Sequence, residues 1–272
     1  MRLPILALSF LLGSAALQAQ PLYYDLSFSS PVQSTNKTDS DLGAYYTGTT
    51  YDFRNVSPTS GTSIDLRVTI TNNNPTNYNF IGSFPDYSSK TGQPDGDLGY
   101  LYEYSGGKNN YGAGGVTYKL DFFTGDGKFK TAFKLSDFRL MIYDVDGEAS
   151  QSESVRVQDK DGFYGYSLPN VGGINVKKET GSYLFTGPGQ NRDEDDPTGA
   201  FILYYHDTSS ISLQMIANTF YGDGGTNGVF SAIDGDLSLI GGGGFGGVVP
   251  VPEPSSALLA LFGTLIFMRR RR

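Results

Sequence analysis

The chain has 272 residues, with no cysteine, no tryptophan and a single histidine, His206. Without cysteine, disulfide-stabilised scaffolds, thiolate metal sites and cysteine nucleophiles are excluded, and one imidazole excludes histidine-rich zinc sites. The formal net charge of −8 argues against electrostatic binding to nucleic acid.

Residues 1–19 have the organisation of a secretory signal peptide. Arg2 precedes an apolar run over residues 3–12, too short to span a bilayer, and small residues follow it. Cleavage after Ala19 or after Ala16 fits this pattern. We therefore expect the rest of the chain to be exported.

Residues 20–240 show the two-residue hydrophobic period of half-buried β-strands. Phe138, Leu140 and Ile142, for example, alternate with polar or mixed neighbours, and no window has the three-and-four spacing of an amphipathic helix. This pattern predicts one all-β domain, an antiparallel β-sandwich or jelly roll. Strands are expected at 23–29, 64–71, 100–104, 116–123, 138–143, 154–158, 163–168, 174–178, 182–185, 200–205, 211–217 and 237–240.

Turn chemistry separates several of these strands. Asp126-Gly127, Asp146-Gly147 and Asp161-Gly162 are dipeptides that reach the positive φ of tight hairpin turns. Long loops are expected at residues 30–60, 72–97 and 187–199.

Three tyrosines alternate within one predicted strand. Because successive strand residues point to opposite faces, Tyr100, Tyr102 and Tyr104 share one face of the sheet. Tyrosine combines an apolar ring face with a polar rim, so this row is a candidate platform for stacking sugar rings. The alternative is that tyrosine and phenylalanine serve as strand residues of high β propensity.

Aspartates recur two residues apart along the predicted loops. Among them, Asp144 and Asp146, together with Glu148, follow the strongest predicted strand and face Glu153 across a turn. Calcium takes six to eight oxygen ligands in irregular geometry, so these three are candidate calcium ligands. The alternative is that aspartate and glycine populate hairpin turns of an acidic protein without any metal.

Catalytic patterns are sparse. His206 is followed by Asp207 and Ser209, but the sequence holds no G-x-S-x-G nucleophile elbow, and the acidic residues are too scattered to single out a catalytic pair. We therefore predict no enzyme activity, with a glycan-active hydrolase as the least favoured alternative.

The last residues form a separate module. Residues 241–250 are glycine-rich and predict a flexible linker that does not pack a core. Residues 255–268 are almost wholly apolar and, as a helix, rise about 21 Å, which is marginal for a membrane span. The positive-inside rule places the chain end in the cytoplasm and the large domain outside. The basic residues behind this prediction are Arg269, Arg270, Arg271 and Arg272.

Residues 251–272 resemble the PEP-CTERM sorting signal: Pro252-Glu253-Pro254 comes first, then the apolar run, then the basic cluster. The resemblance implies that Pro252, Glu253 and Pro254 are recognised by an exosortase-type membrane processing enzyme, and that Arg269 to Arg272 act as the cytoplasmic stop. It also implies removal of the tail and delivery to the envelope or matrix, commonly in organisms that make exopolysaccharide. The alternative is an ordinary membrane anchor that is never processed.

Together these patterns predict an exported cell-envelope or extracellular-matrix protein with a structural or adhesive role. The alternative is a carbohydrate- or calcium-binding module of the same fold, with exopolysaccharide as a candidate partner. No cofactor other than calcium is suggested, and no nucleic-acid partner.

Overall fold

The computed structural model describes residues 23–29, 32–35, 47–58, 60–76, 97–105, 110–148, 151–221, 226–238, 240 and 242–252. The predicted signal peptide, Glu253, Pro254, the apolar run 255–268 and the four terminal arginines lie outside these residues. Within the described ranges, no helix is long and apolar enough to cross a membrane.

The described chain is built from antiparallel strands, as the two-residue period predicts. Short 3₁₀ turns, η2 (Pro197–Gly199) and η3 (Gly242–Gly244), interrupt them. The strands are β1 (Val32–Thr35), β2 (Thr50–Phe53), β3 (Ile64–Thr76), β4 (Leu98–Ser105), β5 (Asn110–Thr124), β6 (Leu135–Tyr143), β7 (Gly147–Glu148), β8 (Gln151–Gln158), β9 (Phe163–Ser167), β10 (Asn175–Glu179), β11 (Ser182–Thr186), β12 (Phe201–Thr208), β13 (Ser210–Tyr221), β14 (Thr226–Asp234) and β15 (Val249–Pro250).

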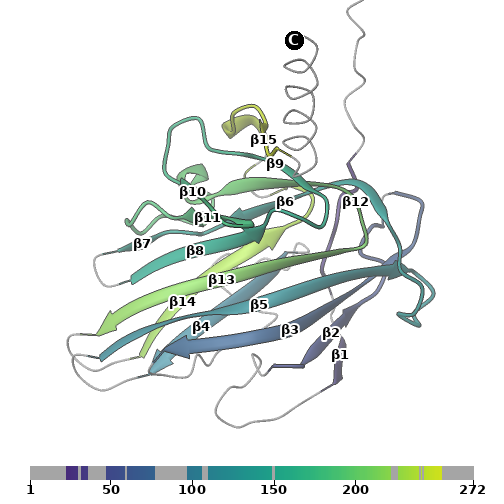
Figure 1. The fold of residues 1–272 in the computed structure, drawn as a ribbon, viewed down its shortest axis with the longest axis horizontal. Coiled ribbons are helices and arrows are strands. Elements are labelled where there is room, and N and C mark those ends of the chain that lie inside the picture. The colour runs from purple at the N-terminus through teal and green to yellow at the C-terminus, as the bar shows by residue number, and fades with distance from the viewer. Residues whose placement is uncertain are drawn as a thin grey trace, which may run out of the picture.

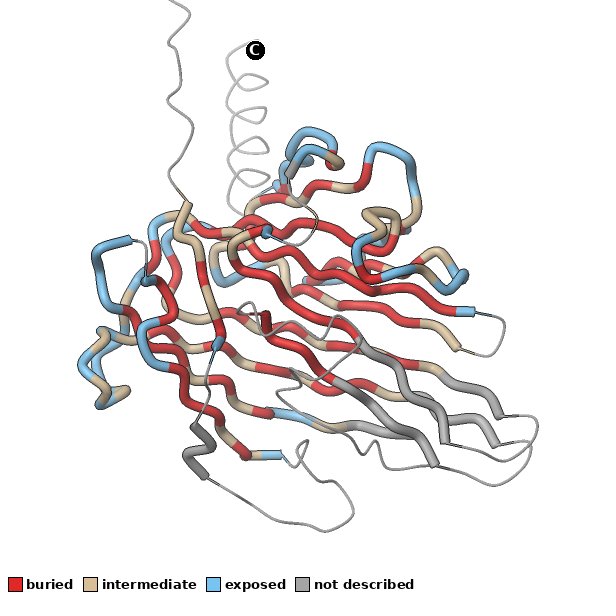
Figure 2. Tube along the Cα trace, turned by 180° about the vertical axis from the view of Figure 1, so that it is seen from behind, coloured by how far each residue is buried: buried red, intermediate tan, exposed pale blue. Residues whose placement is uncertain are grey.

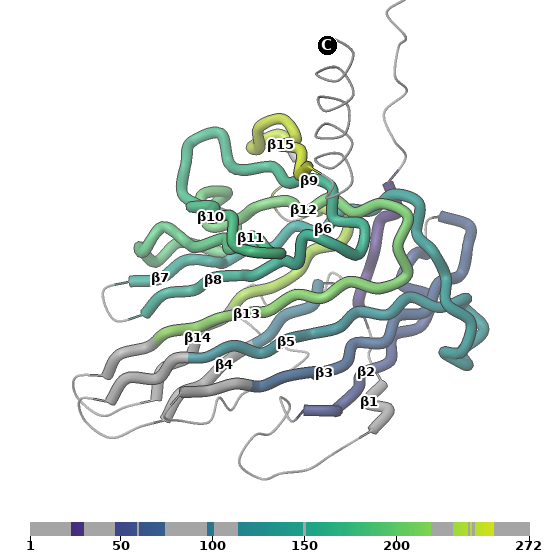
Figure 3. The backbone as a smooth tube through the Cα atoms, in the orientation of Figure 1, coloured from purple at the N-terminus to yellow at the C-terminus, as the bar shows by residue number. Residues whose placement is uncertain are grey.

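These strands form two sheets that pack as a sandwich (Figure 1). The larger sheet has the order β1-β2-β3-β5-β13-β8-β11-β10, with β7 paired to β8, and the smaller has the order β15-β9-β12-β6-β14-β4. In the face-on view of Figure 3, β14 and β4 of the smaller sheet lie behind β13 and β5 of the larger one. The prediction of an all-β antiparallel domain is confirmed for the described residues.

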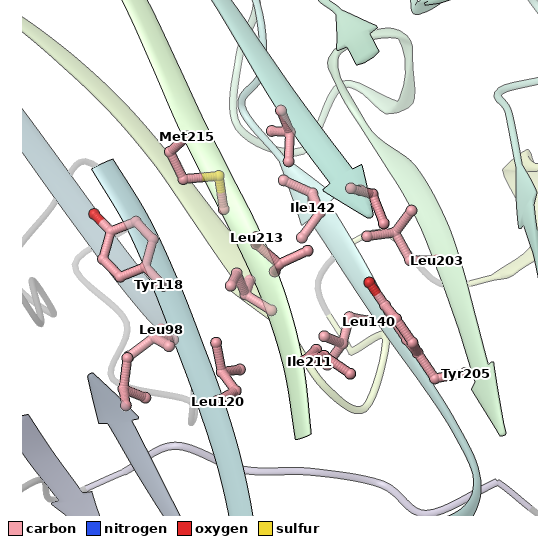
Figure 4. Packing of buried hydrophobic residues seen from close by; sticks show 14 of the residues in the cluster. Leu98, Tyr118, Leu120, Leu140, Ile142, Leu203, Tyr205, Ile211, Leu213 and Met215 are labelled. Carbon is pink, nitrogen blue, oxygen red and sulfur yellow. The ribbon is translucent and has the colours of Figure 1, made fainter. Parts of the chain in front are cut away.

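The main hydrophobic core lies between the two sheets. Its buried residues come from strands of both sheets, as the close view in Figure 4 shows for Leu213 of β13 and Leu140 of β6. Aromatic rings join the layers: Phe185 of β11 stacks on Phe201 of β12 with ring centroids 4.3 Å apart. Figure 2 shows buried residues along the strands and exposed residues gathered in the loops.

A second, smaller cluster covers the outer face of the smaller sheet. Met141, Ile202 and Tyr204 alternate with residues of the main core and therefore point to the opposite face. Leu237 and Phe245, from the C-terminal part of the described chain, pack onto them. This sheet is thus buried on both faces, whereas a surface sheet exposes one.

Most predicted strands are present, but several elements differ from the prediction. Residues 23–29 make only isolated bridges, Tyr24 to Phe138 and Leu26 to Gly235. Residues 237–240 follow a turn in which the Asp234 carboxylate accepts the backbone N–H of Leu237 at 2.7 Å. Strands β1 and β2 fall inside the predicted loop 30–60, and β14 lies where no strand was expected.

The described part of the glycine-rich stretch, residues 242–250, is packed onto the domain rather than free of it. Phe245 forms a bridge with Pro169, and β15 pairs with β9 so that Val249 lies opposite Tyr166. Val251 is buried in the main core, and its N–H donates to the carbonyl of Tyr164 at 2.8 Å. Backbone pairing and two apolar side chains hold the stretch in place despite its glycine content, so it differs from the flexible linker that composition predicts.

Candidate functional site

The predicted calcium ligands occupy the turn after β6. Asp144 and Asp146 are buried, and Glu148, in β7, is exposed. Asp146 lies beside the loop 187–199, because its carboxylate accepts the backbone N–H of Arg192. The N–H of Val145 donates to the carbonyl of Gly199 at 2.9 Å and fastens the same loop. The structure brings Asp144 and Asp146 together in the interior and leaves Glu148 on the surface.

Glu153, in β8, lies beside Asp144 and Asp146, and we call these three residues the acidic turn. The side chain of Glu153 is 4% exposed, and one carboxyl oxygen accepts the hydroxyl of Ser231 at 3.0 Å and the N–H of Asp146 at 3.3 Å. Burial, followed by the charges of Asp146 and Asp144, raises the pKa of Glu153 well above its usual value. The group therefore favours its neutral form in the folded protein.

The acidic turn shows no metal-binding geometry. Among the residues that the structure describes, no three carboxylate or histidine side chains form a group that could hold a metal ion. The cavity beside Glu153 and Tyr100 measures about 10 Å³, room for about one water and far too little for a sugar ring. Calcium binding by Asp144, Asp146 and Glu148 stays a prediction that this geometry does not support.

The predicted tyrosine platform begins in the core. Tyr100 is 2% exposed, its hydroxyl donates to the sulfur of Met215 at 3.1 Å, and its ring packs against Tyr118 of the other sheet. It presents no ring face to solvent, so the platform has no support at this residue. Tyr102 and Tyr104 lie in β4, but their side chains fall outside the description.

His206 stands at the surface near the end of β12. Its ring meets that of Tyr164 edge-on at 6.2 Å, and the neighbouring Asp207 carboxylate accepts Lys134 Nζ at 2.8 Å. Lys134 and Asp207 are both exposed. The Asp207 carboxylate is thus engaged by a lysine, an arrangement typical of a surface ion pair.

A different group of tyrosines meets on the outer side of the smaller sheet. Tyr23 and Tyr164 share a hydrogen bond between their hydroxyls at 3.1 Å, and Tyr204 lies against both rings, with centroids 5.8 and 6.1 Å away. The guanidinium of Arg139 lies 5.1 Å above the ring of Tyr23. We call these four residues the tyrosine face. Burial and the bond from Tyr23 raise the pKa of Tyr164, so its hydroxyl stays protonated.

A β-bulge explains how Tyr164 reaches this face. Tyr205 pairs with Phe163 while Tyr204 pairs with Gly165, which leaves Tyr164 as the extra residue. The strict two-residue period used for the sequence prediction does not anticipate such a shift. The usable signal was the presence of Tyr164 and Tyr204 in two strands that are neighbours in the sheet.

Beside the tyrosine face lies an edge of the domain that carries no charged residue. Residues 163–174 and 237–252 contain no charged side chain, although charged residues make up 18% of the chain. Among the described residues, three large apolar side chains are exposed, and all belong to these stretches: Val171 (74%), Val248 (43%) and Val249 (41%). We call these two stretches the uncharged rim.

Comparison with known proteins gives structural likenesses only. No protein-family model matches the chain, and no curated protein matches it. The N-terminal domain of a Streptococcus gordonii adhesin resembles it with a TM-score of 0.47 and 10% identity, over 77% of this chain and 52% of that one. The glucan-binding protein C of Streptococcus mutans resembles it with a TM-score of 0.40 and 11% identity, over 76% and 63%. The chain spans about half to two thirds of these two proteins.

Proposed function

We propose that this chain is an exported protein of the cell envelope or extracellular matrix, delivered by its C-terminal tail and acting there as a structural or adhesive component. The signal-peptide pattern of residues 1–19 and the sorting-signal resemblance of residues 251–272 support export and delivery. The acidic sandwich, with its buried aromatic core, supplies the part that remains outside.

One observation carries this proposal furthest. Val251 is buried in the main core, and the next residue, Pro252, is exposed and begins the motif Pro252-Glu253-Pro254. Among the described residues, the fold thus reaches Val251, the residue directly before the motif. A membrane enzyme that reads this motif would meet it at the surface of the domain.

The test is to express the full chain in a bacterium that carries an exosortase and to compare it with two variants. Deletion of residues 253–272 should move the protein from the envelope fraction to the medium. Glu253→Ala, which keeps the apolar run and the arginines, should leave the protein attached but unprocessed, as mass spectrometry of the mature C-terminus would show. Equal amounts of all three proteins in the same fraction would refute tail-directed delivery.

A second candidate function is carbohydrate binding at the tyrosine face. The observation that favours it is the pair of half-buried rings of Tyr23 and Tyr164, which lie above the buried ring of Tyr204 with the Arg139 guanidinium beside them. Tyrosine rings stack on the apolar faces of sugars, and Arg139 can donate to their hydroxyls.

The corresponding test is retention on immobilised exopolysaccharide. Tyr164→Ala should lower retention at least several-fold, while Phe129→Ala, at a partly buried surface ring elsewhere, should not. Unchanged retention of Tyr164→Ala, or no retention of the unmodified protein, would remove carbohydrate binding at this face.

A further inference from the structure

The uncharged rim has a composition and a position that suit a lipid surface. We propose that the rim lies against the lipid bilayer while the tail is inserted, so that the sandwich is held in one orientation instead of swinging on a tether. This inference rests on the proposed membrane insertion of residues 255–268 and adds to it a lipid-facing surface of the folded domain.

The connection between the folded domain and the apolar run is short. Pro252 is fixed to the fold through its neighbour Val251, whose N–H is bonded to Tyr164. Glu253 and Pro254 alone separate Pro252 from the apolar run that starts at Ser255. An extended residue spans at most about 3.6 Å, so this connection reaches about 11 Å at most, only a few ångströms more than a headgroup layer of about 5–8 Å. The edge of the domain at β15 must therefore lie at the membrane surface.

The edge of the domain at β15 exposes apolar side chains and carries no charge. Val171, Val248 and Val249 expose apolar surface that water solvates poorly, and no charged group in the rim opposes contact with headgroups. Tyr164, half-buried on the outer side of β9, is a residue that favours the boundary between water and lipid. Outside the two end modules the chain has 15 basic and 27 acidic residues, a net charge of −12, so the lack of charge is particular to the rim.

The two stretches of the rim are joined by backbone hydrogen bonds and form one rigid unit. The N–H of Gly246 donates to the carbonyl of Leu168, and that of Asn170 donates to the carbonyl of Gly244, at 2.9 and 3.0 Å. These bonds continue the pairing of β15 with β9, so the exposed valines on the two stretches keep a fixed relation to one another. A rigid patch loses little conformational entropy when it meets a surface.

A second copy of the chain is the competing occupant of this edge. Strand addition needs free N–H and carbonyl groups along the edge strand. Pro250 and Pro252 have no N–H to offer, which weakens β15 as a template for another strand. We therefore commit to lipid and let the experiment report self-association.

Because the chain contains no cysteine, each introduced cysteine is the only site that a spin label can modify. Spin labels would be attached to the full chain at Val171→Cys, Val248→Cys or Lys128→Cys, and the protein reconstituted into phosphatidylcholine vesicles. Lys128 is exposed in the turn between β5 and β6. In Figure 1 this turn lies at the right, whereas β15 lies at the top. We expect labels at 171 and 248 to be shielded from a water-soluble relaxation agent at least threefold more than the label at 128. We also expect them to respond to a relaxation agent carried on lipid headgroups.

Flotation of the vesicles separates the two levels of the proposal. If the protein floats and all three labels are equally open to water, the anchor stands and the lipid-facing rim is refuted. If the protein does not float, membrane insertion and the rim proposal both fail. Label-to-label broadening at 171 or 248 without vesicles would assign the rim to a second copy and overturn the lipid assignment.

A charge-insertion variant completes the test. Val171→Asp combined with Val248→Asp should leave flotation and Tm unchanged, because both side chains are exposed, but should abolish the shielding of a label at Asn170→Cys. Shielding that survives both aspartates would contradict an apolar contact with lipid.

Discussion

Glu153 sits inside the sandwich with its carboxyl group close to Asp144 and Asp146. Because burial and those charges raise its pKa in the folded state, the folded protein retains a proton that the unfolded chain releases above its usual value near 4.3. Glu153 therefore favours folding below that pH, and this contribution is lost as the pH rises through the folded-state pKa.

The prediction concerns Glu153→Gln, which keeps the shape and the hydrogen-bonding oxygen but cannot ionise. The variant should lose less stability between pH 4 and pH 8 than the unmodified protein, and should be the more stable of the two at pH 8. Thermal unfolding followed across this range measures it. Glu148→Gln, at the exposed residue of the same turn, is the control and should leave the pH profile unchanged; identical profiles for all three proteins would contradict the assignment.

Phe201 illustrates how the aromatic residues are used. It is fully buried and stacks on Phe185, and this contact connects the two sheets. Phe201→Ala should lower the free energy of unfolding by about 3–5 kcal/mol, because it leaves a cavity between the layers. Urea denaturation measures the loss, and Val171→Ala, at an exposed residue, should change stability by less than about 0.5 kcal/mol. A loss below 1 kcal/mol for Phe201→Ala would mean that the sheets do not meet at this contact.

At the scale of elements, β15 depends on a close approach at Gly165. A side-chain Cβ at this position would lie 2.6 Å from a methyl group of Val248 and 3.0 Å from the carbonyl oxygen of Val249. Gly165→Ala should push β15 off β9 and speed amide exchange at Val249 and Val251 at least tenfold, while β9 and β12 stay protected. Gly243→Ala, where a Cβ meets open space, is the matched control. Unchanged exchange in Gly165→Ala would show that β15 tolerates the added methyl group.

The strands that the sequence predicts correctly share one property. In β6, Phe138, Leu140 and Ile142 are buried and apolar at every second position, and residues 211–217 of β13 repeat this pattern, so periodicity alone identifies both strands. Asp161 and Gly162 both have positive φ, as the hairpin signal predicts. The failures have different causes: β14 is interrupted by glycine and asparagine, and β2 is short and flanked by turn residues. Their pairing comes from long neighbouring strands, which a local pattern does not contain.

The candidate sites were harder to predict than the fold, for reasons visible in single residues. Tyr100 belongs to a perfect alternation, but alternation does not say which face is inside, and its face is the core. Tyr164 reaches the tyrosine face through a bulge, and Tyr23 joins it from a segment far away in sequence. A composition rule assigned residues 241–250 to a linker, yet Phe245 and Val251 place that stretch in the fold.

For the whole molecule, the smaller sheet is the part that depends on the chain ends. Its inner face packs on the larger sheet, and its outer face is covered by Tyr23, Leu237 and Phe245. The chain ends thus contribute to folding, in addition to the sorting role that we propose for them. Among the described residues, the last buried side chain is that of Val251, which is also the first residue of the tail resemblance.

This arrangement separates two truncations that composition alone would treat alike. A chain from residue 20 to Pro252 keeps Phe245, β15 and Val251, so its Tm should lie within about 2 °C of that of the full chain from residue 20, a shift equivalent to less than about 1 kcal/mol. A chain that stops at Ile240 loses both buried side chains and exposes Tyr204 and Met141, so it should lose about 2–4 kcal/mol, the range for deleting large core side chains. Thermal and urea unfolding of the three proteins measure these differences in Tm and in the free energy of unfolding. Equal stability of the two truncated chains would show that residues 241–252 are a linker after all, and would remove the fixed exit point on which the proposed membrane orientation depends.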